Sequence, residues 1–148
     1  MRAVFLNLIG FMLLSSWVVA ATGADFSRWY PYPQASQLAQ QEGRVLMVYF
    51  WRHGCPYCDQ MNTFVLSNEA VSQLLEQCFV VASVDSESLE GGALARQTRA
   101  LGTPIFVFYV YQGDTWKELG RLFGSRPSAQ FLGELKQVSA KSGGKGCG

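Results

Sequence analysis

A pair of cysteines separated by two residues, Cys55 and Cys58, is the feature that most constrains this chain. The pair follows a nearly unbroken apolar run, residues 45–51, which is rich in β-prone side chains and typical of a strand buried on both faces. The cysteine pair stands at the start of a stretch with helical character, residues 56–77. The two cysteines are therefore expected between the end of a central strand and the first turn of a helix.

This placement makes the two sulfurs chemically different. Cys55 would lie at the helix tip, where unpaired N–H groups and the helix dipole favour a thiolate over a thiol. In such motifs the pKa of the nucleophilic cysteine falls to roughly 3.5–7.5 from about 8.5. We therefore expect Cys55 to form a mixed disulfide with a substrate and Cys58, one turn further along, to resolve it. Pro56 suits the first helical turn, where a missing N–H has no consequence.

Other uses of a close cysteine pair fit the sequence less well. A structural zinc site needs about four ligands, and beyond the pair the chain offers Cys78, Cys147 and the single histidine, His53, without a second close pair. Haem attachment requires histidine directly after the second cysteine, where Asp59 stands. An inert disulfide spanning so few residues would constrain little of the unfolded chain. Neither a metal nor an organic cofactor is expected.

The remaining segments alternate between helix and strand patterns, and the last two strands are expected to form a hairpin. The order α-β-α-β-α-β-β-α predicts an α/β fold, with a central mixed β-sheet and helices on both faces. The expected elements are an extended arm at 29–33, helices at 35–42, 56–77 (with a break at 67–68), 91–101 and from Pro127 onward, and strands at 45–51, 79–84, 105–111 and 116–123.

The first residues have the pattern of an export signal. Arg2 is followed by an uncharged apolar stretch and then by small residues up to Ala24. We predict a signal peptide over residues 1–24 and a periplasmic or otherwise extracytoplasmic location. The competing interpretation is a retained membrane anchor, because the uncharged span of residues 3–24 is about as long as the 20 residues that a spanning helix needs. Association with a membrane is expected only in that second case.

Composition and charge exclude one broad class of function. With 49% hydrophobic and 16% charged residues, the chain has the composition of one ordinary globular domain. Its formal net charge is +1, and Lys and Arg are scattered among Asp and Glu. Because no basic stripe offers itself to a phosphate backbone, binding of nucleic acid is not expected.

Several segments, taken together and in order, resemble landmarks of the thioredoxin superfamily. The resemblance covers roughly residues 35–141 and is strongest to exported thioredoxin-like proteins of the SoxW type and to the C-terminal domain of the DsbD-type membrane electron transporter. It implies a thioredoxin fold, which we place at residues 25–141, before a Gly-rich tail at 142–148 that is expected to be flexible. The segments are Tyr49-Phe50-Trp51, Cys55-Pro56-Tyr57-Cys58, Gly102-Thr103-Pro104 and Gly120-Arg121-Leu122-Phe123-Gly124.

The resemblance also implies which residues contact a substrate. Pro104 would be a cis-proline facing the redox pair, and a cis X–Pro bond is uncommon enough to be there for a purpose. The backbone of Thr103 would pair with the substrate peptide next to the mixed disulfide. Trp51 matches a family aromatic near the active site, although as a strand residue it would also fit the core.

Three residues around the sulfurs are candidate modulators of the pKa of Cys55. Pro56 and Tyr57 separate the cysteines, and His53 lies two residues before the first of them. A charged imidazole there would stabilise a thiolate, whereas the alternative for His53 is an exposed loop position without a role.

The resolving step departs from the family pattern. Thioredoxins carry a buried acid six residues before the first active-site cysteine, and that place holds Tyr49 here. A phenol with a pKa of about 10 is a poor base at neutral pH. The proton of Cys58 must then pass to water, to Asp59 or to another carboxylate.

The other two cysteines have separate expectations. Cys78 stands at the start of an apolar strand and is expected to be a small buried hydrophobe. Cys147 lies in the Gly-rich tail, where an exported thiol tends to find a partner. Pairing with Cys78, pairing with another chain and no pairing all stay open.

The predicted function is an exported thiol–disulfide oxidoreductase that exchanges electrons with protein thiols and disulfides through Cys55 and Cys58, acting as a reductant. A DsbD-type membrane transporter is the expected electron donor by resemblance. A non-catalytic thioredoxin-fold module or chaperone that binds peptides is the alternative, although a pure binder does not need both cysteines. Glutathione-dependent activity of the glutaredoxin type is a minor alternative, because a Pro–aromatic pair between cysteines also occurs there.

Overall fold

The computed structural model of the chain describes residues 29–144 and residue 147. The predicted signal peptide, residues 1–24, lies outside the described residues. Within the described part of the chain, no helix combines the length and the apolar character needed to cross a bilayer.

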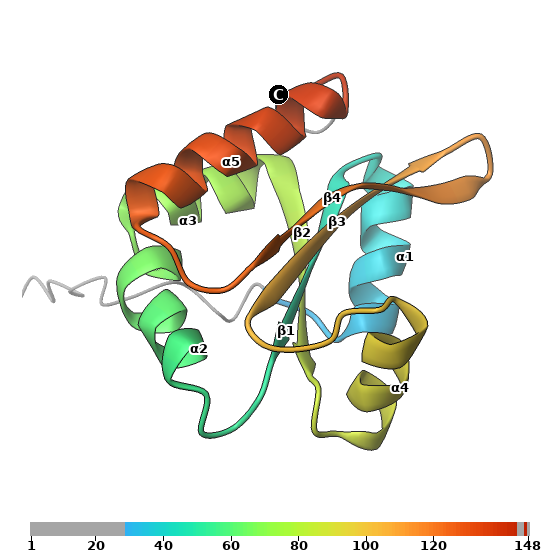
Figure 1. The fold of residues 1–148 in the computed structure, drawn as a ribbon. Helices are drawn as coiled ribbons and strands as arrows, with labels where there is room; N and C mark the ends of the chain where they lie inside the picture. The colour runs from blue at the N-terminus through green and yellow to red at the C-terminus, as the bar shows by residue number, and fades with distance from the viewer. Residues whose placement is uncertain (1–28, 145–146, 148) are drawn as a thin grey trace, which may run out of the picture.

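The helices and strands follow one another in the predicted order (Figure 1). The helical stretch after the cysteines is divided into three pieces, the middle one a π-helix. The elements are α1 (Tyr32–Glu42), β1 (Val45–Trp51), α2 (Pro56–Gln60), η2 (Met61–Leu66), α3 (Glu69–Cys78), β2 (Phe79–Asp85), α4 (Leu89–Gln97), β3 (Ile105–Gln112), β4 (Thr115–Phe123) and α5 (Ser128–Lys141).

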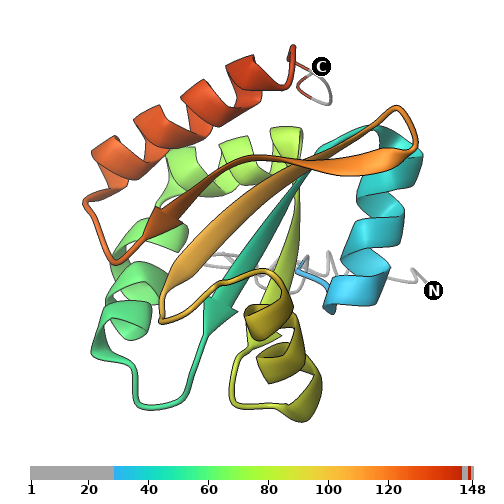
Figure 2. The same ribbon diagram turned by 45° about the vertical axis from the view of Figure 1, so that its right-hand side comes forward.

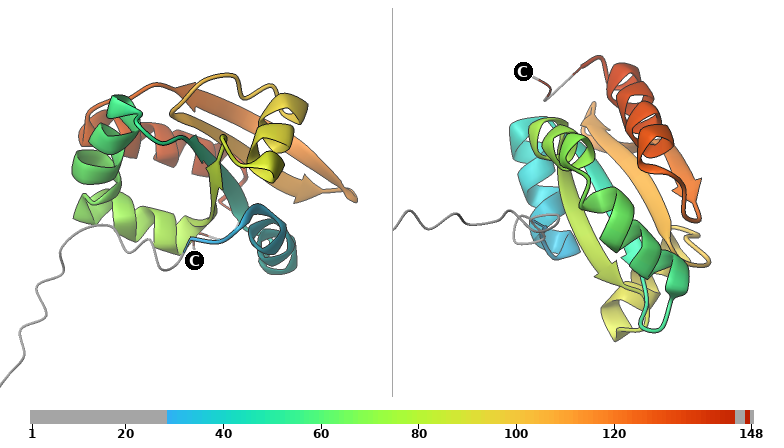
Figure 3. Two further views of the ribbon diagram at one scale, coloured as in Figure 1. Left: turned by 90° about the horizontal axis from the view of Figure 1, so that it is seen from below. Right: turned by 90° about the vertical axis from the view of Figure 1, so that its left-hand side faces the viewer.

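The four strands form one mixed sheet in the order β2-β1-β3-β4. β1 is parallel to β2 and antiparallel to β3, and β3 and β4 form the predicted hairpin. Helices α1 and α4 cover one face of this sheet, and α2, α3 and α5 cover the other (Figures 2 and 3). The expected α/β architecture with helices on both faces is confirmed.

Each strand of the sheet's centre supplies apolar side chains to both faces, which explains its unbroken apolar sequence. Along β1, Met47 and Tyr49 belong to the core beneath α3 and α5, while Val48 and Phe50 belong to the core beneath α1 and α4. The aromatic side chain of Phe106 in β3 is fully buried in the first of these cores.

Two helix starts differ from the sequence prediction. α1 begins at Tyr32, so Pro33 lies in its first turn instead of in an extended arm, a position where proline's missing N–H is tolerated. α4 begins at Leu89, because the Ser88 side chain accepts a hydrogen bond from the Gly91 N–H and caps the helix.

The double glycine in α4 reflects a close approach to the sheet rather than a helix boundary. A Cβ on Gly91 would overlap the carbonyl oxygen of Asp85 at the end of β2. α4 can therefore lie directly against this end of β2 only because residue 91 has no side chain.

A disulfide joins Cys78, at the end of α3, to Cys147. Its two Cα atoms are 4.4 Å apart, and the Ser139 hydroxyl lies 2.8 Å from the Cys147 sulfur. The expectation of a free, inert thiol at Cys78 is therefore wrong, although the residue is buried as expected. The bond holds Cys147, within the segment predicted to be a flexible tail, against the main body of the domain.

Candidate active site

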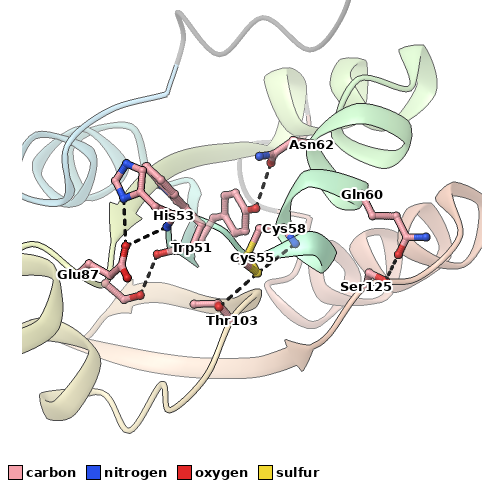
Figure 4. The surroundings of a disulfide bond; sticks show 11 residues. Trp51, His53, Cys55, Cys58, Gln60, Asn62, Glu87, Thr103 and Ser125 are labelled. Carbon is pink, nitrogen blue, oxygen red and sulfur yellow. Dashed lines mark hydrogen bonds and ion pairs between the residues drawn. A yellow bond between two sulfur atoms is a disulfide. The ribbon is translucent and has the colours of Figure 1, made fainter.

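Cys55 and Cys58 are joined in a disulfide at the start of α2 (Figure 4). Cys55 is the N-cap of the helix, and its sulfur accepts a hydrogen bond from the Cys58 N–H at 3.2 Å. Pro56 occupies the first helical turn, as predicted. Both cysteines are buried in this oxidised state, whereas Tyr57 between them is 62% exposed.

The loop before β3 completes the surroundings of the disulfide. The Thr103–Pro104 peptide bond is cis, as the resemblance predicted. The Thr103 hydroxyl donates to the Cys55 sulfur at 3.4 Å, and Figure 4 shows it directly facing that sulfur. The pairing of β1 with β3 explains why Thr103 lies close to Cys55. Phe50 near the end of β1 pairs with Ile105 at the start of the antiparallel β3.

His53 is held by acidic residues that the sequence analysis did not find. Its backbone N–H donates to a carboxylate oxygen of Glu87 at 3.0 Å, and its ring Nδ1 lies 3.0 Å from the same oxygen (Figure 4). The ring Nδ1 also lies 3.7 Å from a carboxylate oxygen of Asp85. These hydrogen bonds from His53, first from the backbone and then from the ring, hold the pKa of the Glu87 carboxyl below its ordinary value. The described contacts of the His53 ring thus point away from the sulfurs.

The parallel pairing of β1 and β2 was the signal that could have revealed this cluster. The carboxyl ends of parallel strands meet at one edge of a sheet. Trp51, paired with Asp85, therefore brings the segments that follow both strands together. The ligand atoms of His53, Asp85 and Glu87 lie within 4.8 Å of one another, a grouping that metals can use. In this structure the histidine and the carboxylates bind each other.

Trp51 is fixed by its indole. Its Nε1–H donates to the Ser83 hydroxyl at 2.9 Å, and its ring stands edge-on to the His53 ring at 5.1 Å. The side chain is half-buried at the end of β1, where the active-site loop begins.

Tyr49 lies beneath the helix that carries the cysteines, in the place where the family has an acid. Its ring stacks on Phe106 with 4.7 Å between centroids, and its hydroxyl donates to the Asn62 side-chain oxygen at 3.0 Å. Asn62 follows Cys58 by four residues and so shares its side of the helix. Burial, aided by the negative charge of Asp59, raises the pKa of the Tyr49 phenol well above its ordinary value. Tyr49 therefore cannot serve as the base for Cys58 near neutral pH.

Comparison with known proteins identifies the fold and the chemistry. Residues 32–139 match the Thioredoxin-like domain family. The chain belongs to this family. The solution structure of a thioredoxin from Thermus thermophilus is 61% identical and matches 78% of this chain and 89% of that chain, with a TM-score of 0.75. The reduced C-terminal domain of DsbD from Neisseria meningitidis is 20% identical and matches 72% of this chain and 91% of that chain, with a TM-score of 0.53, and so shows the shared fold alone.

The curated relatives that the chain resembles are thiol:disulfide interchange proteins. The thiol:disulfide interchange protein DsbD of Yersinia enterocolitica is 28% identical over 109 residues, which are 73% of this chain and 18% of the relative. The chain thus spans less than a fifth of that protein's length. Taken with the disulfide of Cys55 and Cys58, the family and the likeness to a thioredoxin make this chain a thiol–disulfide oxidoreductase of the thioredoxin-like type.

The unequal surroundings of the two sulfurs give a first prediction. After reduction, Cys55 should react with iodoacetamide about tenfold or more faster than Cys58, because the helix tip, the Cys58 N–H and the Thr103 hydroxyl all favour its thiolate. Peptide mapping by mass spectrometry separates the two sites from the other cysteines. In denaturant the two rates should converge, and equal rates in the folded protein would contradict the assignment.

Proposed function

We propose that this chain is an exported reductant, which donates electrons to disulfides of proteins outside the cytoplasm. The observation that carries the proposal is that the hydrogen-bond donors around the Cys55 sulfur, among the described residues, are neutral groups. These donors are the Cys58 N–H and the Thr103 hydroxyl. The ring of His53, a candidate modulator of the pKa of Cys55, is paired with Glu87 instead. A strong oxidant needs a highly stabilised reduced form, and these contacts do not supply one.

In the proposed direction, the Cys55 thiolate attacks one sulfur of a substrate disulfide. The substrate S–S bond breaks, and its other sulfur leaves as a thiolate that takes up a proton. Cys58 loses its proton, attacks the Cys55 sulfur and releases the second substrate thiol. Two electrons pass to the substrate, and the disulfide of Cys55 and Cys58 is the oxidised product.

The contacts at the site support roles for four neighbouring residues. We infer that an extended substrate segment lies against Thr103 and Pro104, because the Thr103 hydroxyl already reaches the sulfur that would carry the mixed disulfide. Trp51, fixed by Ser83 at the start of the active-site loop, would border the same segment. Tyr57, exposed between the cysteines, would meet the substrate from the helix side.

The proposed reaction takes place outside the cytoplasm and needs a source of electrons there. The pattern of residues 1–24 supports a signal peptide, with a retained anchor as the alternative, and the domain would then occupy residues 25–141. Outside the cytoplasm no glutathione or thioredoxin pool keeps thiols reduced. A DsbD-type membrane transporter is the electron donor we propose, because the curated relatives are proteins of that name.

The redox potential of the Cys55–Cys58 couple tests the direction. We expect a value near that of thioredoxin, about −270 mV, when the protein is equilibrated with dithiothreitol buffers. In cells quenched with acid and alkylated, the pair should be largely reduced and should become oxidised when the transporter is deleted. A Cys55→Ser variant provides the unreactive control. A potential near the −120 mV of the oxidant DsbA, with the pair oxidised in both strains, would reverse the assignment.

A further inference from the structure

A groove opens beside the active-site disulfide, between α4 and the loop that leads into β3. Thr103 lines one side of it and also donates to the Cys55 sulfur at 3.4 Å. The groove is therefore within reach of a peptide joined to Cys55. Leu101 and Phe123 form its apolar wall and are 74% and 66% exposed, respectively.

The wall next to Thr103 has no space for a side chain at residue 102. Gly102 has a φ of +115°, and a Cβ there would stand 2.8 Å from a ring carbon of Phe123. The Phe123 ring thus covers residue 102, which leaves backbone and an aromatic edge as the surface that a substrate meets. A segment with an apolar side chain near its cysteine fits this part of the groove.

The opposite side of the groove is cationic. Arg52 and Arg96 line it, and none of its lining residues is acidic. The Arg96 guanidinium turns back along α4, because one of its terminal nitrogens lies 3.5 Å from the place a Cβ on Gly92 would take. In the described part of the chain, neither arginine is recorded in an ion pair or a side-chain hydrogen bond. The carboxylate of Glu87, which feels the charge of Arg52, is hydrogen-bonded to His53 instead.

We propose that this groove is a substrate subsite for an acidic side chain, an Asp or Glu within a few residues of the reactive cysteine, with Arg52 and Arg96 as its partners. The inference rests on the proposed function in taking a protein cysteine as the substrate. Two cations that share a groove with Thr103, and for which no ion pair closer than 4 Å is found among the described residues, complement a carboxylate and oppose a lysine. The apolar wall opposite them accommodates the rest of the segment.

The test uses short peptides with one cysteine, linked as disulfide homodimers and identical except for Asp, Asn or Lys placed two residues before or after that cysteine. The specificity constant kcat/KM for their reduction is measured with the full chain. At low salt we expect Asp over Asn over Lys at one of the two positions, by about 1.5-fold to fivefold per step, the range for exposed ion pairs. The ranking should shrink in 1 M NaCl, where charges are screened within about 3 Å.

Variants locate the effect in the groove. The double variant R52Q/R96Q should reduce the three peptides at similar rates, and R96E should favour Lys over Asp. K136Q on α5, on the other face of the sheet, is the matched control and should keep the wild-type ranking. The rate of each variant with the neutral hydroxyethyl disulfide, which is too small to fill the groove, serves as the reference to which its peptide rates are normalised.

Two results would overturn the subsite: equal rates for the three peptides with the wild-type protein at low salt, or an unchanged ranking in R52Q/R96Q. The proposed function fails differently. If the couple proves to be an oxidant, the reductant assignment is lost, whereas the same Asp-first ranking in oxidation of the reduced peptides would still support the subsite.

Discussion

Replacing Cys78 and Cys147 together with alanine is expected to lower the free energy of unfolding by about 4 kcal/mol. Their disulfide closes a loop over a sequence separation of 69, and in the chain-entropy model most of its effect comes from restricting the unfolded chain. The measurement is guanidinium unfolding with the Cys55–Cys58 pair oxidised in both proteins.

Activity should not follow stability in this variant. Cys78 immediately precedes Phe79, which pairs with Val45 at the start of β1, whereas Cys55 follows the other end of that strand. The rate of insulin reduction at 25 °C should therefore stay within about twofold of wild type. Substitutions at sites far apart in a structure usually have independent effects. An unchanged unfolding midpoint would mean that the bond does not form in solution, and a large loss of activity would mean that the tail reaches the active site.

Tyr49→Asp should have the second large effect, a loss of about 3–5 kcal/mol in unfolding free energy or more. The substitution removes a fully buried ring that stacks on Phe106 and places a carboxyl in its space. If proton transfer from Cys58 limits turnover, the same variant should resolve mixed disulfides faster. Stopped-flow measurement of the resolving step, at a temperature where the variant stays folded, separates the two consequences.

The loss of unfolding free energy in Tyr49→Asp should grow as pH rises. Burial raises the pKa of the introduced carboxyl above its unfolded value of about 3.9. Below that value the group is neutral in both states and adds no ionisation penalty. As pH rises through it, only the unfolded chain ionises, so stability falls until the folded-state pKa is reached.

Tyr49→Phe is the matched control for this variant. It keeps the ring and removes only the hydroxyl that donates to Asn62, so it should lose about 1 kcal/mol and show no new pH dependence. Turnover by Tyr49→Phe should be unchanged, because a phenol whose pKa is raised by burial stays protonated near pH 7 and does not accept the proton of Cys58. A large drop in its turnover would mean that the hydroxyl takes part in the proton path.

Much of the fold follows from local sequence patterns. The run at 45–51 forms a central strand because both of its faces are buried, and Cys55 caps α2 because proline at residue 56 suits a first turn. The start of α4 differs from the sequence prediction, because the two glycines that suggest a helix boundary instead allow close contact with β2. Whether a glycine serves a turn or a close approach depends on a neighbour that is distant in the chain.

The parts of the site that sequence reasoning missed are those fixed by pairing in three dimensions. The sequence around His53 does not predict its contact with Glu87, because the two residues meet only through the parallel pairing of β1 and β2. Four cysteines allow three pairings, so the bond between Cys78 and Cys147 could be named among the alternatives but not chosen. Tyr49 was identified from its spacing to Cys55, but its anchoring by Asn62 depended on the helix that covers it.

The antiparallel register of β1 and β3 also bears on how fast this protein meets a substrate. Phe50 and Ile105 are paired within the sheet, so the loops that carry Cys55 and Thr103 are attached to one rigid platform. Their relative position is set when the sheet forms, and no loop closure is needed to bring them together on encounter. Such preorganisation removes an entropic barrier from binding, which leaves thiolate reactivity and docking as the determinants of the exchange rate.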